Sequence, residues 1–172
     1  INGKILFNKS VTEILIENKI IPNNFAFNSY LSKEYDPIHL NDIEPVFSDT
    51  KYWKIGDVFI SIRNQSSIIH YRPKTNQVIN YITGPFAQQH DVDIINNHSI
   101  AVFNNNVKLF VDGYKIDGNN EVVIYDFKKK EYSTYLNESL MKYDVRTATA
   151  GRSEILNSGD LFIEERVSGR IL

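Results

Sequence analysis

Histidine and arginine side chains stand at matching places in a pattern that the sequence repeats. His39, His90 and Arg152 each begin a short strand-like segment that leads through a turn to a longer apolar segment, and Arg63 follows the apolar segment of the first unit. Cationic donors of this kind suit anions such as sulfate, phosphate or carboxylate. Histidine is also a nucleophile and a proton carrier near neutral pH. We therefore expect one polar, cationic cluster if the fold brings these residues together.

Each of these residues also has a purely structural alternative. His90 precedes Asp91, and a histidine held by a neighbouring carboxylate needs no ligand. His39 follows an Asp-Pro pair that favours a capped loop, and Arg63 ends an apolar strand where a salt bridge is the usual role. His70, within a strand, is expected at the surface or in packing. Two histidines and an arginine make a poor metal set because arginine does not ligate. We expect no metal and no cofactor.

The elements that position these residues read as strands. Short apolar stretches alternate with turn signals, and many Tyr, Phe, Ile and Val residues favour β structure. Within residues 1–35, Val11–Ile16 and Lys19–Ile21 are strand-like, and Ser29–Tyr35 is a helical turn or a loop. The later strands are predicted at Ile43–Phe47, Asp57–Ile62, Ser67–Tyr71, Gln77–Thr83, Val92–Ile95, Ser99–Phe103, Glu121–Asp126, Glu131–Leu136, Ser153–Leu156 and Asp160–Glu164.

The repeat predicts an all-β fold made of β-propeller blades. The units recur at a spacing near the roughly 40–50 residues of a blade, with insertions in loops. We expect three to four antiparallel four-stranded blades in an incomplete propeller. Residues 1–35 would be part of a preceding blade or a lead-in segment, and three consecutive blades would occupy about 36–85, 86–140 and 141–172, the last incomplete. The alternative is an ordinary antiparallel sandwich.

Composition limits the partners and the compartment. The net charge is −2, from 19 basic and 21 acidic residues, which gives no reason to expect nucleic-acid binding. The chain has no cysteine, so disulfides and thiolate metal sites are excluded. No apolar run approaches the roughly 20 residues of a membrane span. These features leave the localisation unknown.

Three short motifs, in order, resemble the arylsulfotransferase family. They are the run from His39 to Ile43, the run from Ser61 to Ile69 that contains Arg63, and Gln89-His90-Asp91. The family has a His-Ile-Asn motif, a Ser-x-Arg-x-Gln-Ser strand end and a later Gln-His pair in this order. Asn104-Asn105-Asn106 stands where the family often has Phe-Asp-Asn-Gly. The resemblance covers roughly residues 36–172.

The resemblance implies an enzyme that moves a sulfuryl group from an aryl sulfate to a phenol without a nucleotide donor. His90 matches the histidine that carries the sulfuryl group covalently, and His39 and Arg63 match residues that hold its oxygens. Asn41, Arg152 and Asn105 are the expected substrate-binding residues. The family is often periplasmic, which suggests a periplasmic or extracellular location. Asp91 stands where the family usually has Thr or Ser.

Two other functions remain open at this stage. One is a non-catalytic propeller that binds an anionic ligand or glycan, and the other is a structural or protein-interaction propeller. An Asp91 carboxylate that faced the channel would favour both over catalysis, because it would repel a sulfate ester. In every case we expect the fragment alone to be inactive and its apolar blade flanks to allow self-association.

Overall fold

Strands dominate the structure. A computed structural model describes residues 3–20 and 36–172, with 43% strand and 12% helix, in antiparallel sheets that do not close into a barrel. The first sheet has the order β1 (Leu40–Pro45), β2 (Val58–Ile62), β3 (Ser67–Arg72) and β4 (Gln77–Thr83). The second has the order β10 (Glu131–Tyr135), β9 (Glu121–Asp126), β6 (Ser99–Asn104) and β5 (His90–Asn96). The third consists of β11 (Arg152–Ile155), β12 (Leu161–Glu165) and β13 (Arg170–Ile171).

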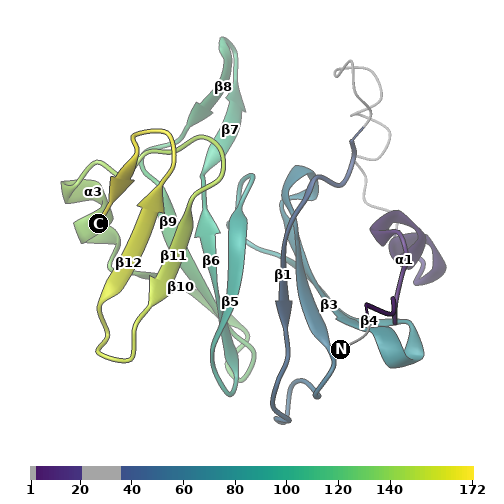
Figure 1. Cartoon of the computed structure of the whole chain (residues 1–172). Helices are drawn as coiled ribbons and strands as arrows, with labels where there is room; N and C mark the ends of the chain where they lie inside the picture. The colour runs from purple at the N-terminus through teal and green to yellow at the C-terminus, as the bar shows by residue number, and fades with distance from the viewer. Residues whose placement is uncertain (1–2, 21–35) are drawn as a thin grey trace.

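The sheets stand side by side and are joined through their first strands. β1 contacts β5, and β5 contacts β11, so the first strand of each sheet lies next to that of its neighbour (Figure 1). This is the arrangement of successive propeller blades around their innermost strands. The prediction of an all-β, propeller-like fold is confirmed. The predicted domain boundaries stay a prediction.

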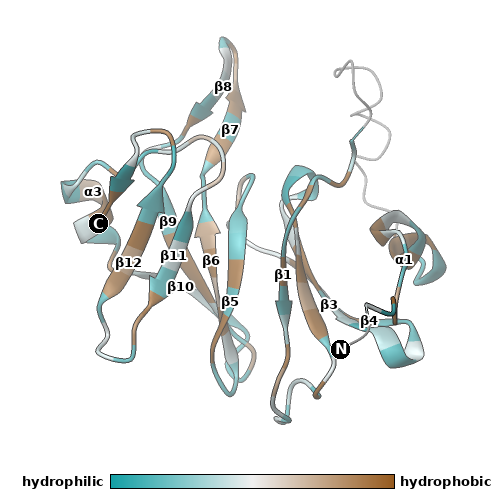
Figure 2. Ribbon diagram, viewed as in Figure 1, coloured by the Kyte–Doolittle hydropathy of each residue, from teal (hydrophilic) through white to brown (hydrophobic). Residues whose placement is uncertain are grey.

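Apolar clusters fill the spaces between these layers. Because side chains alternate across a strand, one face of the first sheet packs on the second sheet and the other face packs on a helix. Hydrophobic residues run along β3 and the helix (Figure 2). The cluster between the first two sheets contains Phe59, Ile68, Val92 and Val102, and that between the second and third contains Phe103, Val122 and Ile163.

Two predicted strands near the N-terminus are wrong. Val11–Glu17 is helix α1, whose start is stabilised by the Ser10 N–H, which donates to Glu13 Oε2 at 3.1 Å. Ile14 and Leu15 are buried against Ile60, Ile62 and Ile69 of the first sheet. An apolar run this short is compatible with one face of a helix and with a buried strand. The packing of the run against the rest of the fold determines which of the two forms. Lys19 and Ile20 are not strand either. Ser29–Tyr35 lies outside the described residues.

Two further elements were absent from the expected pattern. A hairpin of β7 (Val107–Phe110) and β8 (Gly113–Ile116) is inserted between β6 and β9 and projects from the end of the second sheet (Figure 1). Helix α3 (Asn137–Lys142) follows β10 and buries Leu140 in the cluster shared by the second and third sheets. These elements are only four to six residues long, which is too short for a clear periodic signal even in the apolar β7.

Candidate functional site

Four of the six predicted site residues lie on segments that meet at one end of the first two sheets: His39, Asn41, Arg63 and His90. Arg63 lies in the turn η2 (Arg63–Gln65) that follows β2, and its backbone N–H donates to the carbonyl of His39 at 3.2 Å. Asn41 Nδ2 donates to the carbonyl of Gln89, the residue before β5, at 2.7 Å. The beginning of β1, the end of β2 and the beginning of β5 therefore share one end of the two sheets.

His90 is half-buried and bonded at both ring nitrogens. Its Nδ1 lies 2.6 Å from Oδ1 of Asn105, and its Nε2 accepts the N–H of Ala150 at 3.1 Å. Burial lowers the pKa of the His90 imidazole, and the charges of Arg63 and His39 lower it further against opposing hydrogen bonds. The ring is therefore neutral at pH 7.

Arg63 is a cation without an ion pair among the described residues, although the Asp36 carboxylate favours its charge from a longer distance. It has no ion pair within residues 3–20 and 36–172; its Nη1 donates to Asn64 Oδ1 at 3.0 Å, and its Nε is buried without a hydrogen-bond partner in that part of the chain. Burial lowers the pKa of the guanidinium. Arginine nevertheless keeps its positive charge near neutral pH. The salt bridge that would give Arg63 a purely structural role is thus absent from the described residues.

His39 follows its structural alternative more closely. Its Nδ1 lies 2.7 Å from Oδ2 of Asp36, and its backbone N–H donates to Oδ1 at 2.6 Å. Burial opposes these bonds, yet they lower the pKa of the Asp36 carboxyl. The imidazole is about half exposed, at 48%. The two histidines are not equivalent in register, because His90 is paired within its sheet, with Phe103, whereas the first paired residue of β1 is Leu40, with Ile62.

The Asp91 carboxylate is bonded to the third sheet. Its Oδ2 accepts the N–H of Ser153, at the start of the third sheet, at 2.7 Å. Burial raises its pKa to about 6, and the neighbouring Arg152 opposes that rise. Arg152 is exposed at the start of β11, so it lies beside Asp91 on the side of the third sheet. The carboxylate serves as a link between sheets.

Two of the three expected substrate-binding residues are used by the protein itself. Asn105 is fully buried, and its Nδ2 donates to the carbonyls of Thr147 and Ala150 at 2.9 and 2.8 Å. Asn41 is half-buried. Its amide N–H donates to the carbonyl of Gln89, and its buried Oδ1 has no partner among the described residues. Asn105 thus contacts His90 rather than an open space.

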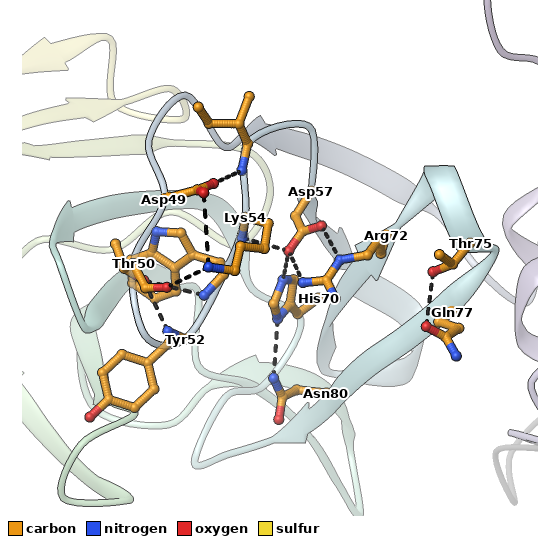
Figure 3. Close-up of polar contacts among 12 residues, drawn as sticks. Asp49, Thr50, Tyr52, Lys54, Asp57, His70, Arg72, Thr75, Gln77 and Asn80 are labelled. Carbon is orange, nitrogen blue, oxygen red and sulfur yellow. Dashed lines mark hydrogen bonds and ion pairs between the residues drawn. The ribbon is translucent and has the colours of Figure 1, made fainter.

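A second polar cluster at the opposite end of the first sheet had been overlooked. Asp57 precedes β2, and its carboxylate accepts bonds from His70 at 2.8 Å and Arg72 at 2.7 Å (Figure 3). His70 is fully buried rather than at the surface, and its Nδ1 lies 3.1 Å from Asn80 Nδ2. The cluster borders a pocket of about 590 Å³. His70 and Arg72, two residues apart on β3, and Asp57 just before the neighbouring strand β2 were the available signal.

Comparison with known proteins decides the family. A family model described as arylsulfotransferase (ASST) matches residues 1–172.

The chain belongs to the arylsulfotransferase family.

The resemblance found in the motifs is thereby confirmed, and sulfuryl transfer from aryl sulfates to phenols is the activity associated with this family. A search of curated proteins gave no match. Within residues 3–20 and 36–172, no helix is both long and apolar enough to cross a membrane. The same residues contain no group of three or more His, Cys, Asp or Glu side chains arranged for a metal ion.

Proposed function

We propose that this arylsulfotransferase-family chain carries a site that transfers a sulfuryl group from an aryl sulfate to a phenol through a covalent sulfo-His90. The observation that carries the proposal is a half-buried His90 imidazole held by hydrogen bonds at both nitrogens, at the end of the sheets where Arg63 has no ion pair in the described part of the chain. A neutral imidazole has the lone pair that attack requires, and a guanidinium without an ion pair suits the anion that is attacked.

The first step forms a bond between a His90 nitrogen and sulfur while the bond from sulfur to the aryl oxygen breaks. The electron pair of that bond leaves with the aryl oxide, and the ring becomes a positively charged sulfo-imidazolium. In the second step the oxygen of a phenol attacks sulfur, the N–S bond breaks, and neutral His90 returns. The acceptor gives up one proton and the released aryl oxide takes one up. Arg63 and His39 would stabilise the charge on the sulfuryl oxygens.

The bond from the Ser153 N–H to Asp91 weakens the main argument against catalysis, because it offsets part of the carboxylate's charge. A carboxylate aimed at the anion site would repel a sulfate ester, but this one is bonded to the Ser153 N–H. One observation favours the alternative of a non-catalytic propeller that binds an anion or glycan. In the described conformation the Ala150 N–H is bonded to His90 Nε2, so this nitrogen is not free to attack. In that case replacement of His90 would weaken binding only modestly.

A transfer assay with p-nitrophenyl sulfate and phenol tests the proposal. We expect His90→Asn to lower transfer at least about 10³-fold and Arg63→Gln about 10²-fold. The matched control is His98→Asn, because His98 lies in the turn between β5 and β6 at the far end of the sheet. Full transfer by His90→Asn would reject the proposal. Since a propeller site is shared among blades, we expect activity from the closed propeller and none from residues 1–172 alone.

A further inference from the structure

We infer that Asn105 is a positioning residue that selects which nitrogen of His90 attacks, and that the backbone of Ala150 masks that nitrogen until the turn Thr147–Gly151 moves. The inference rests on the proposed role of His90. It assigns to Asn105 a function that requires no contact with the substrate.

The orientation of the Asn105 amide is fixed by what surrounds it. Two backbone carbonyls, of Thr147 and Ala150, lie 2.9 and 2.8 Å from Nδ2. Carbonyls only accept hydrogen bonds, so the NH₂ group must face them and Oδ1 must face His90. Asn105 is fully buried, so the reversed amide would leave both its own NH₂ group and the two carbonyls badly paired.

The amide in turn fixes the tautomer of His90. Oδ1 can only accept, so Nδ1 of the neutral ring carries the proton and donates it across the 2.6 Å contact. The second contact agrees, because the Ala150 N–H can only donate and therefore needs a lone pair on Nε2. Both contacts select the Nδ1–H form, and they are coupled, because Asn105 Nδ2 also holds the carbonyl of Ala150. Nε2 is the nitrogen left to attack sulfur, and Asn105 Oδ1 faces the ring when it gains positive charge.

The same turn that masks Nε2 is anchored to both sheets. On the side of the second sheet, Thr147 N–H donates to Asn120 Oδ1 at 2.5 Å. On the side of the third sheet, Val167 N–H donates to Thr147 Oγ1 at 3.4 Å. Because Nε2 has one lone pair, the Ala150 N–H must leave it before sulfur can bind. The hydrogen bond to the third sheet is the longer of the two, so we expect it to break first when the turn moves.

Nitrogen-15 NMR of the histidine rings in the chain tests the inference without any sulfate ester. The wild-type protein should show His90 as the Nδ1–H tautomer, with a coupling between the Ala150 amide nitrogen and Nε2. Asn105→Ala should raise the population of the Nε2–H tautomer at least about tenfold, equivalent to about 1.4 kcal/mol. Asn105→Asp keeps an acceptor beside Nδ1 and should keep the wild-type tautomer.

Asn104→Ala is the matched control, because Asn104 is a neighbouring, fully buried asparagine that bonds Ala87 and Pro85 instead of His90. It should leave the tautomer unchanged. An Nε2–H tautomer in the wild-type protein would overturn the inference even if every variant failed to fold, and so would an unchanged tautomer in Asn105→Ala. Sulfation of His90 at Nδ1 would refute this inference alone, whereas the expected tautomer without any sulfation would refute the proposed function alone.

Discussion

At the scale of single residues, carboxyls crowd the first strands of the sheets. Burial, followed by repulsion from Asp91 and Glu44, raises the pKa of Asp93 to about 7. Burial raises that of Glu44 as well. Burial of these carboxyls, with the neighbouring acidic groups as the smaller cause, therefore costs stability when they are ionised. Because these pKa values are raised, the cluster lowers the free energy of unfolding as the pH rises.

We predict that Asp93→Asn stabilises the protein at pH 8 by about 1–2 kcal/mol and flattens its pH dependence. The folded pKa near 7 lies above the usual 3.8, so the folded state binds the proton more tightly. This contribution to the free energy of unfolding is complete below about pH 4 and is lost as pH rises through 7. Urea titrations from pH 4 to pH 8 measure it. The exposed Asp112→Asn should change nothing, and an equally steep loss in Asp93→Asn would contradict the assignment.

Residue types revealed part of the site, and packing decided the rest. His39 and Arg63 are bonded backbone to backbone at the end of the first sheet that Asn41 joins to Gln89. Arg152, which the repeat placed with His39 and His90, begins the third sheet instead. That these side chains form one site stays a prediction. The sequence could not show that Asn105 would face inward, because that depends on the turn Thr147–Gly151 reaching back from another sheet. Nor could it show the direction of Asp91. Both depend on hydrogen bonds between residues more than 40 positions apart.

At the scale of elements, buried polar contacts hold the strands of the first sheet in place. Asp57 accepts bonds from His70, Arg72 and the Lys54 backbone, and His70 stacks on Phe59 with ring centroids 4.7 Å apart. Burial opposes ionisation, but these donors lower the pKa of Asp57 to about 2. Burial lowers the pKa of His70, so a neutral ring donates to the carboxylate. The cluster ties β2 to β3 and β4.

We predict that Asp57→Asn destabilises the protein by about 3 kcal/mol, because it removes the charge that the buried side of Arg72 requires. The folded pKa lies below 3.8, so the contribution is present above about pH 4 and disappears as pH falls towards 2. Chemical denaturation at pH 7 measures the loss. Asp49→Asn is the control, because the Asp49–Lys54 pair is exposed and 3.8 Å long, and it should cost less than about 1 kcal/mol. Equal effects would contradict the account.

We predict that Gly151→Ala costs about 1–3 kcal/mol more than Gly118→Ala. Both glycines have positive φ, +94° and +82°, so both variants strain the backbone alike. A Cβ at Gly151 would also meet Phe103 Cε1 at 2.6 Å and Thr147 Cγ2 at 2.9 Å, whereas one at Gly118 would meet nothing within 4 Å. Urea midpoints compare the two. Equal losses would show that the turn beside His90 is not packed as described.

Most strands were predictable, and the exceptions have physical reasons. The runs within Ile43–Phe47, Asp57–Ile62 and Ser67–Tyr71 are β-rich and bounded by turn residues, and they form β1, β2 and β3 with shifts of a few residues. Val11–Ile16 was predicted as a strand because six residues are too few to distinguish the 3.6-residue period of a helix from the two-residue period of a strand. Its neighbours decided in favour of α1, since the free face of the first sheet offered an apolar surface.

At the scale of the whole molecule, the two flanks differ. Helix α1 covers the free face of the first sheet, where Ile14 and Leu15 are buried. The opposite face, on the third sheet, exposes Phe162 at 42% and Ile171 at 71%. Such a face is suited to packing against a further layer.

We propose that residues 1–172 self-associate through the exposed flank of the third sheet. Phe162→Ser should lower the weight-average mass in sedimentation equilibrium, because Phe162 points away from the buried Ile163 beside it. Leu109→Ser is the control, since this residue is exposed on the projecting β7–β8 hairpin. An unchanged mass in Phe162→Ser, or an equal decrease in Leu109→Ser, would argue against this flank as the interface.

The covalent state of His90 tests the central claim most directly. The closed propeller that contains these sheets would be mixed with p-nitrophenyl sulfate in a single turnover without acceptor, quenched, digested and examined by mass spectrometry. The account predicts one added sulfuryl group on the peptide that carries His90, lost on addition of phenol and absent in His90→Asn. An unmodified His90 peptide from protein that still transfers sulfate would contradict it.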